Sequence, residues 1–224
     1  LARRAGAAPF IATIFLSAGL VFLVQPMFAK MATPLLGGAP AVWNVSLVCF
    51  QAALLAGYAY AHLLARAQNV KLQIGVHALF LLLASFCLPL SISGFLGTPD
   101  TTRPTLWLIG TFAISIAPPF AVISATAPLV QSWYARSGRP DAADPYHLYA
   151  ASNAGSLIGL AAYPLLMEPF TRLGAQTEIW SLGYLVLAVL LIGCGLMTAD
   201  TGAQVASPQP EAATSHPAAS QSVW

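Results

Sequence analysis

The sequence predicts an all-α integral membrane protein with six transmembrane helices, and three observations support this fold class. Only 7% of the 224 residues are charged, against roughly 25% in soluble domains. Hydrophobic residues make up 58% of the chain, and the mean hydropathy is +0.74. Six intervals free of Asp, Glu, Lys and Arg reach the roughly 20 residues that a helix needs to cross the hydrocarbon core. Because lipid cannot satisfy free backbone groups and no alternating barrel pattern occurs, these intervals predict helices.

The six intervals divide the chain into three parts. Residues 1–8 form a cytoplasmic N-terminus, residues 9–197 a six-helix transmembrane domain, and residues 198–224 a disordered Ala/Pro/Ser-rich linker or tail that is too polar to bury a core. The chain begins without Met and the linker stops at Trp224, so we expect a natural protein that continues further. The predicted helices are 9–30, 41–65, 72–94, 106–128, 146–168 and 176–197.

The basic residues predict the orientation, because cytoplasmic loops carry an excess of Lys and Arg. With the N-terminus inside, six basic residues are cytoplasmic and three lie outside, and an even number of spans places the C-terminus inside as well. The cytoplasmic set is Arg3, Arg4, Arg66, Lys71, Arg136 and Arg139, and the outer set is Lys30, Arg103 and Arg172.

The composition excludes several function classes. A net charge of +2, scattered along the chain, cannot form a basic patch for nucleic acid. The cysteines lie in apolar runs without a CxxC or ligand-spaced histidines, so we expect neither disulfides nor a metal site. No nucleophile elbow, HExxH or phosphate loop occurs, so no catalytic residue and no cofactor is predicted.

A polar stripe follows the second predicted helix. Its members recur at spacings of seven, seven and four residues and are Asn44, Gln51, Tyr58 and His62. At about 100° per residue they fall within roughly 40° of one another. Such a stripe makes hydrogen bonds inside the bundle, lines a path for a solute or ion, or faces lipid.

Two helices carry faces of small residues, which let neighbouring helices approach closely. In the second helix these are Ala53, Gly57 and Ala61. In the fifth they are Ala151, Gly155 and Gly159. Beside the second small face lie the polar residues Tyr149, Ser152, Asn153, Ser156 and Tyr163. We interpret both small faces as packing surfaces.

Prolines predict helix breaks in the first and fourth helices, at Pro26 and at Pro118 with Pro119. These occupy corresponding places in two three-helix halves, which is typical of transporter repeats, although chance similarity between apolar helices is the alternative. Lys30 and Glu168 are the charges closest to the span interiors. They form an ion pair at the outer surface or reach separately into the headgroups.

Several short motifs carry a resemblance to a known family. They include FLSAGL at 15–20, QPMFAK at 25–30, LLGGAPAVWN at 35–44, GYAYAH at 57–62, SATAPL at 124–129 and LYAASNAGS at 148–156. In this order, over about residues 10 to 190, they resemble the membrane region of bacterial fused major-facilitator/spermidine-synthase-like proteins.

The resemblance implies a multi-pass protein of the bacterial inner (plasma) membrane. It also implies two partners beside the lipid bilayer: a C-terminal synthase-like domain in the cytoplasm and a second membrane half. Since the 224 residues contain no aminopropyltransferase-like domain, we expect no enzyme activity from this chain. The implied function is to anchor that domain and to pass a polyamine-like or other small solute.

The substrate-path candidates are Gln25, Asn44, Gln51, Tyr58, His62 and Asn153. Two other functions fit the same residues. The chain is half of a major-facilitator-type secondary transporter for an unrelated solute, or it is a purely structural membrane anchor.

Overall fold

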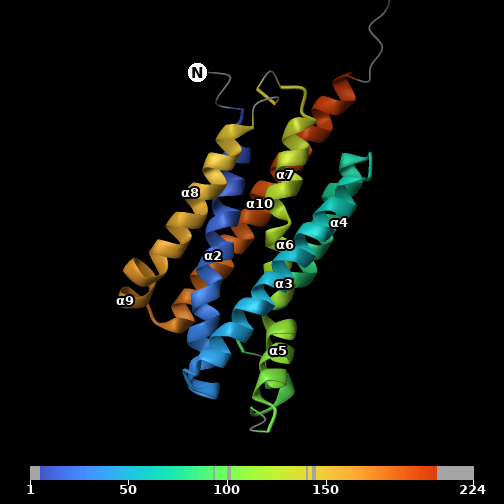
Figure 1. Ribbon diagram of the computed structural model, residues 1–224. Helices are drawn as coiled ribbons and strands as arrows, with labels where there is room; N and C mark the ends of the chain where they lie inside the picture. Colours follow the sequence, from blue (N-terminus) through green and yellow to red (C-terminus); the bar gives the residue numbers. More distant parts are fainter. Residues whose placement is uncertain (1–5, 93, 100–101, 140, 143–144, 206–224) are drawn as a thin grey trace, which may run out of the picture.

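The computed structural model describes residues 6–92, 94–99, 102–139, 141–142 and 145–205, and every regular element within them is helical. The elements form six consecutive segments, in the order of the six predicted helices, and neighbouring segments run in opposite directions (Figure 1). The first three are α2 (Ala8–Leu36), α3 (Pro40–Ala65) and α4 (Val70–Ser85). The fourth comprises α5 (Pro104–Ser115), α6 (Ala117–Ser124) and α7 (Thr126–Ala135), after a short turn η1 (Gly94–Leu96). The last two are α8 (Tyr146–Ala162) with the π-helical turn η2 (Tyr163–Met167) and α9 (Glu168–Phe170), and then α10 (Leu173–Val205).

Local sequence explains where the helices begin and end. Pro9, Pro40 and Pro104 stand in the first turns of α2, α3 and α5, where a missing N–H costs nothing. The Asn69 side chain caps α4 by accepting hydrogen bonds from the backbone N–H groups of residues 71 and 72. Gly37 ends α2 at a φ of 76°, a conformation that glycine adopts without strain.

Four helical stretches are long and apolar enough to cross a membrane: Ala8–Leu36, Pro40–Ala65, Tyr146–Phe170 and Leu173–Ala199. The pair Pro104–Ser115 and Ala117–Ala135 is a fifth candidate if its 59° bend is counted within one span. α4 has 16 residues, or about 24 Å, and falls short of the roughly 30 Å hydrocarbon core. The described residues therefore give four or five candidate spans, and the predicted sixth is not confirmed.

The third helix ends at Ser85 rather than near residue 94 as predicted. Residues 86, 87 and 88 each donate their backbone N–H only three residues back, which tightens the last turn. Pro89 follows and has no N–H to continue the ladder, and it also disfavours the helical conformation of Leu88.

The fourth segment is interrupted at Pro118 and Pro119, as predicted, because neither can donate to the carbonyls of Ile114 and Ser115. The Cys87 thiol lies 3.6 Å from the Ile114 carbonyl oxygen and donates to it instead. The break predicted at Pro26 is wrong: α2 continues through Pro26 to Leu36. A single proline removes one N–H, and a helix packed among other helices tolerates that loss. The three-plus-three repeat therefore stays a prediction.

Residue 198 does not begin a linker as predicted, because α10 continues through Val205. Thr198 donates its hydroxyl to the Cys194 carbonyl, and Ala199 is still buried. Residues 206–224 and Arg3 and Arg4 lie outside the described residues.

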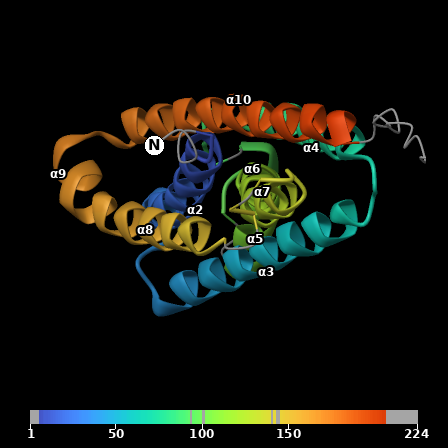
Figure 2. The same ribbon diagram turned by 90° about the horizontal axis from the view of Figure 1, so that it is seen from above.

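Seen along the bundle, α10 and α4 occupy one side, α3 and α8 the opposite side, and α2 with α5 to α7 lie between them (Figure 2). Phe50 of α3 marks the centre, in edge-to-face contact with Phe28, Phe112 and Phe120 at centroid distances of 4.8–5.8 Å. These rings join α2, α3, α5 and α6 through directional aromatic contacts.

The small-residue faces pack as predicted. Gly159 of α8 lies against Gly19 of α2, and a Cβ on Gly159 would stand 2.5 Å from the Gly19 carbonyl oxygen. Gly155 is equally close to the Phe15 carbonyl, and Gly57 of α3 to the Ala121 carbonyl of α6. Because lipid supplies no hydrophobic force between helices, such close backbone approach contributes much of the packing.

Candidate functional site

The polar stripe of α3 lies on the surface of the bundle. Asn44, Gln51, Tyr58 and His62 are all exposed, and 48% of Tyr58 is accessible. The interpretation that the stripe makes hydrogen bonds inside the bundle is therefore wrong within the described residues. That interior position belongs to the small face of α3, whose three residues are all buried.

The stripe occupies one defined flank of α3. It is centred roughly 120° around the helix from the small face at Gly57. Tyr60 is on the other flank, where its hydroxyl lies 3.2 Å from Nδ1 of His77 in α4. The stripe therefore lies on the flank of α3 that faces away from α4. In the ribbon, α3 and α8 lie on the same side of the bundle (Figure 2).

The stripe also runs along most of α3. From Asn44 to His62 the helix rises about 27 Å, close to the roughly 30 Å thickness of the hydrocarbon core. At its far end His62 lies 3.3 Å from the guanidinium of Arg66, through Nε2. A polar surface of this length reaches through the bilayer rather than marking one interface.

The other two path candidates lie apart from this stripe. Gln25 is half-buried on α2, and its amide donates to the Val21 carbonyl in the same helix at 3.3 Å. Asn153 is exposed on α8, on the side turned away from the small face that contacts α2. Among the path candidates and the two charged residues, only Lys30 and Glu168 are joined to each other by a hydrogen bond within the described part of the chain.

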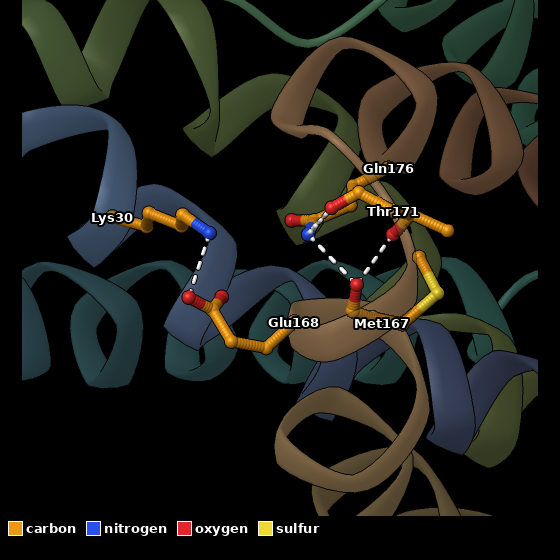
Figure 3. Close-up of polar contacts among 5 residues, drawn as sticks. All are labelled: Lys30, Met167, Glu168, Thr171 and Gln176. Atoms are coloured by element: carbon orange, nitrogen blue, oxygen red, sulfur yellow. Dashed lines mark hydrogen bonds and ion pairs between the residues drawn. The ribbon is translucent and has the colours of Figure 1, made fainter.

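Lys30 and Glu168 form an ion pair, with 2.7 Å between Nζ and Oε1 (Figure 3). Lys30 comes from the second half of α2, and Glu168 begins α9 directly after the π-helical turn. Their side chains are 38% and 45% exposed, so solvent and solutes reach both.

The turn that carries Glu168 is fixed from its far side. The Met167 carbonyl accepts hydrogen bonds from the Thr171 hydroxyl at 2.5 Å and from the Gln176 amide at 3.2 Å (Figure 3). Gln176 is fully buried in the first turns of α10 and also donates to the Thr171 carbonyl. This bonding positions the carboxylate of Glu168 toward α2.

Sequence reasoning missed the buried glutamines. Gln176 holds the α9 turn, and Gln73 joins α4 to α7 through a hydrogen bond with Trp133. Gln73 lies two residues after Lys71 and Gln176 two residues before Glu178, so both resemble polar side chains at an exposed helix end, and no signal in the sequence marks them as buried.

The loop after α7 contains a second ion pair. Arg139 donates to both carboxylate oxygens of Asp141, at 3.0 and 3.4 Å, and its guanidinium lies 5.7 Å from the Tyr134 ring centroid. The Arg139 hydrogen bond lowers the pKa of the Asp141 carboxyl below its ordinary value. The pair ties the loop to the end of α7.

Comparison of the sequence with protein-family models and with curated proteins, and of the structure with solved structures, gives no match. The fold itself defines the class: an all-helical chain with several helices of membrane-spanning length and composition. In the described residues, no group of three or more His, Cys, Asp or Glu side chains could hold a metal ion.

Proposed function

We propose that this chain is the membrane-spanning module of a spermidine-synthase-like membrane protein, and that its α3 stripe forms one wall of a path for a polyamine-like solute. The exposed stripe carries the proposal. Leaving an amide or hydroxyl in hydrocarbon without a partner costs roughly 2–7 kcal/mol, so water, a solute or another protein surface must cover these side chains.

The position of the stripe favours a path over a purely structural anchor. Its four side chains do not serve packing within this chain, because the small faces do that. Amide, phenol and imidazole groups recur along this flank, with the exposed Leu47 and Leu55 between them, and offer hydrogen bonds to a passing amine, while tyrosine rings attract ammonium groups. The family resemblance supplies the choice of solute, and a second membrane half would supply the opposite wall.

The proposed arrangement has six spans in the bacterial inner membrane with both ends cytoplasmic. A domain that follows the last helix then stands in the cytoplasm, where a synthase-like domain would receive or release solute. A reporter fused after Ala206 should be active only on the cytoplasmic side, and activity only outside would overturn this orientation.

Thiol accessibility tests the path. In a background without Cys49, Cys87 and Cys194, we expect Gln51→Cys and Tyr58→Cys to react with a water-soluble thiol reagent. Matched controls are Ala52→Cys and Ala59→Cys, which are exposed at the same depths but about 100° around the helix. Lipid covers the controls in this arrangement, so they should react at least about tenfold more slowly because thiolate needs water.

The choice of solute is tested with the same variants. Spermidine should slow the labelling of Gln51→Cys, whereas sucrose at equal concentration should not. Protection by neither solute, with the stripe still reactive, would favour a half-transporter for an unrelated solute. If the stripe is as unreactive as the controls, it is covered by protein or lipid rather than water, and the chain is an anchor.

A further inference from the structure

We propose that the Lys30–Glu168 pair closes a binding site for a primary ammonium group, which a di- or polyamine opens by displacing Lys30 from Glu168. This proposal rests on the proposed function, because it names where the amine first binds. Three observations carry it: a cavity beside the pair, a phenol within it whose capacity to donate is unfilled, and the chemistry of its walls.

The cavity measures about 400 Å³ and lies between α2, the start of α3 and the segment formed by η2 and α9. Lys30, Thr33, Trp43, Tyr163 and Glu168 are among its walls. Trp43 directly precedes Asn44, the first residue of the polar stripe, so the cavity lies at the end of the proposed path. Its volume accommodates one end of an alkyl amine together with water.

Tyr163 carries this phenol. Only 7% of the residue is exposed, and its hydroxyl interacts with the neighbouring Glu168 carboxylate without forming a hydrogen bond of ordinary geometry, so its capacity to donate is not filled by any described residue. A buried hydroxyl with an unfilled donor is costly, so a ligand that bonds to it gains affinity. Tyr163 also opens the π-helical turn, a feature that is frequent at functional sites.

The walls suit a cation better than an anion. The rings of Trp43 and Tyr163 attract ammonium groups through their electron-rich faces. Thr33 already donates its hydroxyl to the Ala29 carbonyl at 2.7 Å. Pro34 has no N–H, so it donates nothing to a ligand and leaves the Lys30 carbonyl without its helical donor.

The ion pair already shows the mode of binding. The Lys30 Nζ atom is itself a primary ammonium group, held 2.7 Å from the Glu168 carboxylate. A solute amine therefore finds a carboxylate that already pairs with an ammonium group, and it must release Lys30 to bind there. Both side chains are partly exposed, and the long Lys30 side chain can swing into the headgroup region when displaced.

The experiment measures equilibrium binding of labelled spermidine to the purified full chain in lipid nanodiscs. Glu168→Gln keeps the shape but removes the charge, and we expect about a tenfold loss of affinity or more. Lys30→Met removes the internal competitor, and we expect affinity to rise several-fold. Glu178→Gln is the matched control, because Glu178 is exposed near the start of α10 and lies outside this cavity.

The sign of the Lys30→Met effect separates this proposal from a structural ion pair. A structural pair predicts lower stability and unchanged spermidine affinity in both variants, and that result would overturn the proposal. Tighter binding of propionate than of spermidine would also overturn it. Trp43→Leu leaves the ion pair intact and should weaken binding about fivefold, so it answers the question if an ion-pair variant fails to fold.

Failure of this site and failure of the path are distinguishable. If spermidine protects Gln51→Cys from labelling but Glu168→Gln binds spermidine as tightly as the parent, the path stands and this site does not. If Glu168→Gln loses binding while the stripe is unreactive, the chain binds amines at one end without passing them.

Discussion

Trp133 of α7 donates its indole N–H to the side-chain oxygen of Gln73 in α4, with 2.7 Å between the two atoms. Both side chains are fully buried, and the Gln73 amide also donates to the Ala67 carbonyl at 2.6 Å. One side chain thus joins the loop before α4, the helix itself and the end of α7. This network holds the shortest of the six segments in place.

Gln73→Leu should therefore destabilise the protein. The substitution leaves the Trp133 N–H buried without a partner, at about 1–3 kcal/mol, and also removes the donor to the partly exposed Ala67 carbonyl. Gln51→Leu is the matched control. It makes the same chemical change, but Gln51 is exposed, so no buried group loses its partner. Reversible unfolding in mild detergent measures both, and equal effects would contradict the role of Gln73.

The contact between Gly159 and Gly19 predicts a second loss of stability. A methyl group in Gly159→Ala would press on the α2 backbone at 2.5 Å, which forces α8 and α2 apart and costs roughly 1–3 kcal/mol. Gly193→Ala places the same methyl group where no atom lies within 4 Å. That control should be neutral or gain up to about 1 kcal/mol from helix propensity. Thermal unfolding of the two variants should thus move in opposite directions, and a neutral Gly159→Ala would show that the interface can relax.

The Gly159–Gly19 contact was predictable from the sequence, whereas the Gln73–Trp133 hydrogen bond was not. The charge-free intervals locate all six helical segments, because a charged side chain is costly in lipid whichever helices pack beside it. The small faces were also predictable, because glycine and alanine repeated at helical spacing serve mainly to let another helix pack closely. Lys30 and Glu168 stood out as the charges nearest the span interiors, and the structure brings them together.

Other features depend on neighbours that periodicity does not reveal. The spacing of Asn44, Gln51 and Tyr58 shows that they share a flank but not what that flank faces. Pro26 and Pro118 look alike in the sequence, yet only the second interrupts its segment, where Pro119 adjoins it and removes a second N–H. Tyr163 was visible only as a member of a polar side of the fifth helix, since the turn beside it comes from Pro164 and the contacts of Met167.

The Arg139–Asp141 pair predicts a pH dependence of stability. Because the hydrogen bond from Arg139 lowers the pKa of Asp141 in the folded state, the pair contributes stability above the ordinary Asp value of about 3.9 and loses it as pH falls through the folded-state value. Both side chains are partly exposed, so the pair contributes at most about 1 kcal/mol. Asp141→Asn should lower the melting temperature slightly at pH 7, and the difference from the parent should shrink below about pH 4. An equal difference at pH 7 and pH 3 would assign the effect to lost packing instead.

The membrane topology turns on whether the chain crosses the bilayer between α3 and α5. α4 alone is too short, but the residues that follow it continue along the bundle. Leu88 and Leu90 line a cavity of about 1000 Å³ together with Leu35 at the end of α2 and Leu173 at the start of α10. Those two ends lie opposite the end of the bundle where α4 begins (Figure 1). Residues 89–92, after the tight turn at residues 86–88, span up to about 13 Å if extended, and together with the roughly 24 Å of α4 this exceeds the roughly 30 Å core.

We therefore expect thiols at Gln68 and Thr98 to be labelled from opposite sides of the membrane. Both residues are exposed, one before α4 and one before α5. In inside-out vesicles an impermeant thiol reagent should modify Gln68→Cys but not Thr98→Cys, and right-side-out vesicles should reverse the pattern. Opposite-side labelling makes six crossings and keeps both ends of the bundle in the cytoplasm, as the charge distribution predicts. Labelling of both thiols from one side would make α4 a re-entrant segment, reduce the crossings to five and place the two ends of the bundle on opposite sides. The N-terminus and a synthase-like domain after α10 could then not both lie in the cytoplasm.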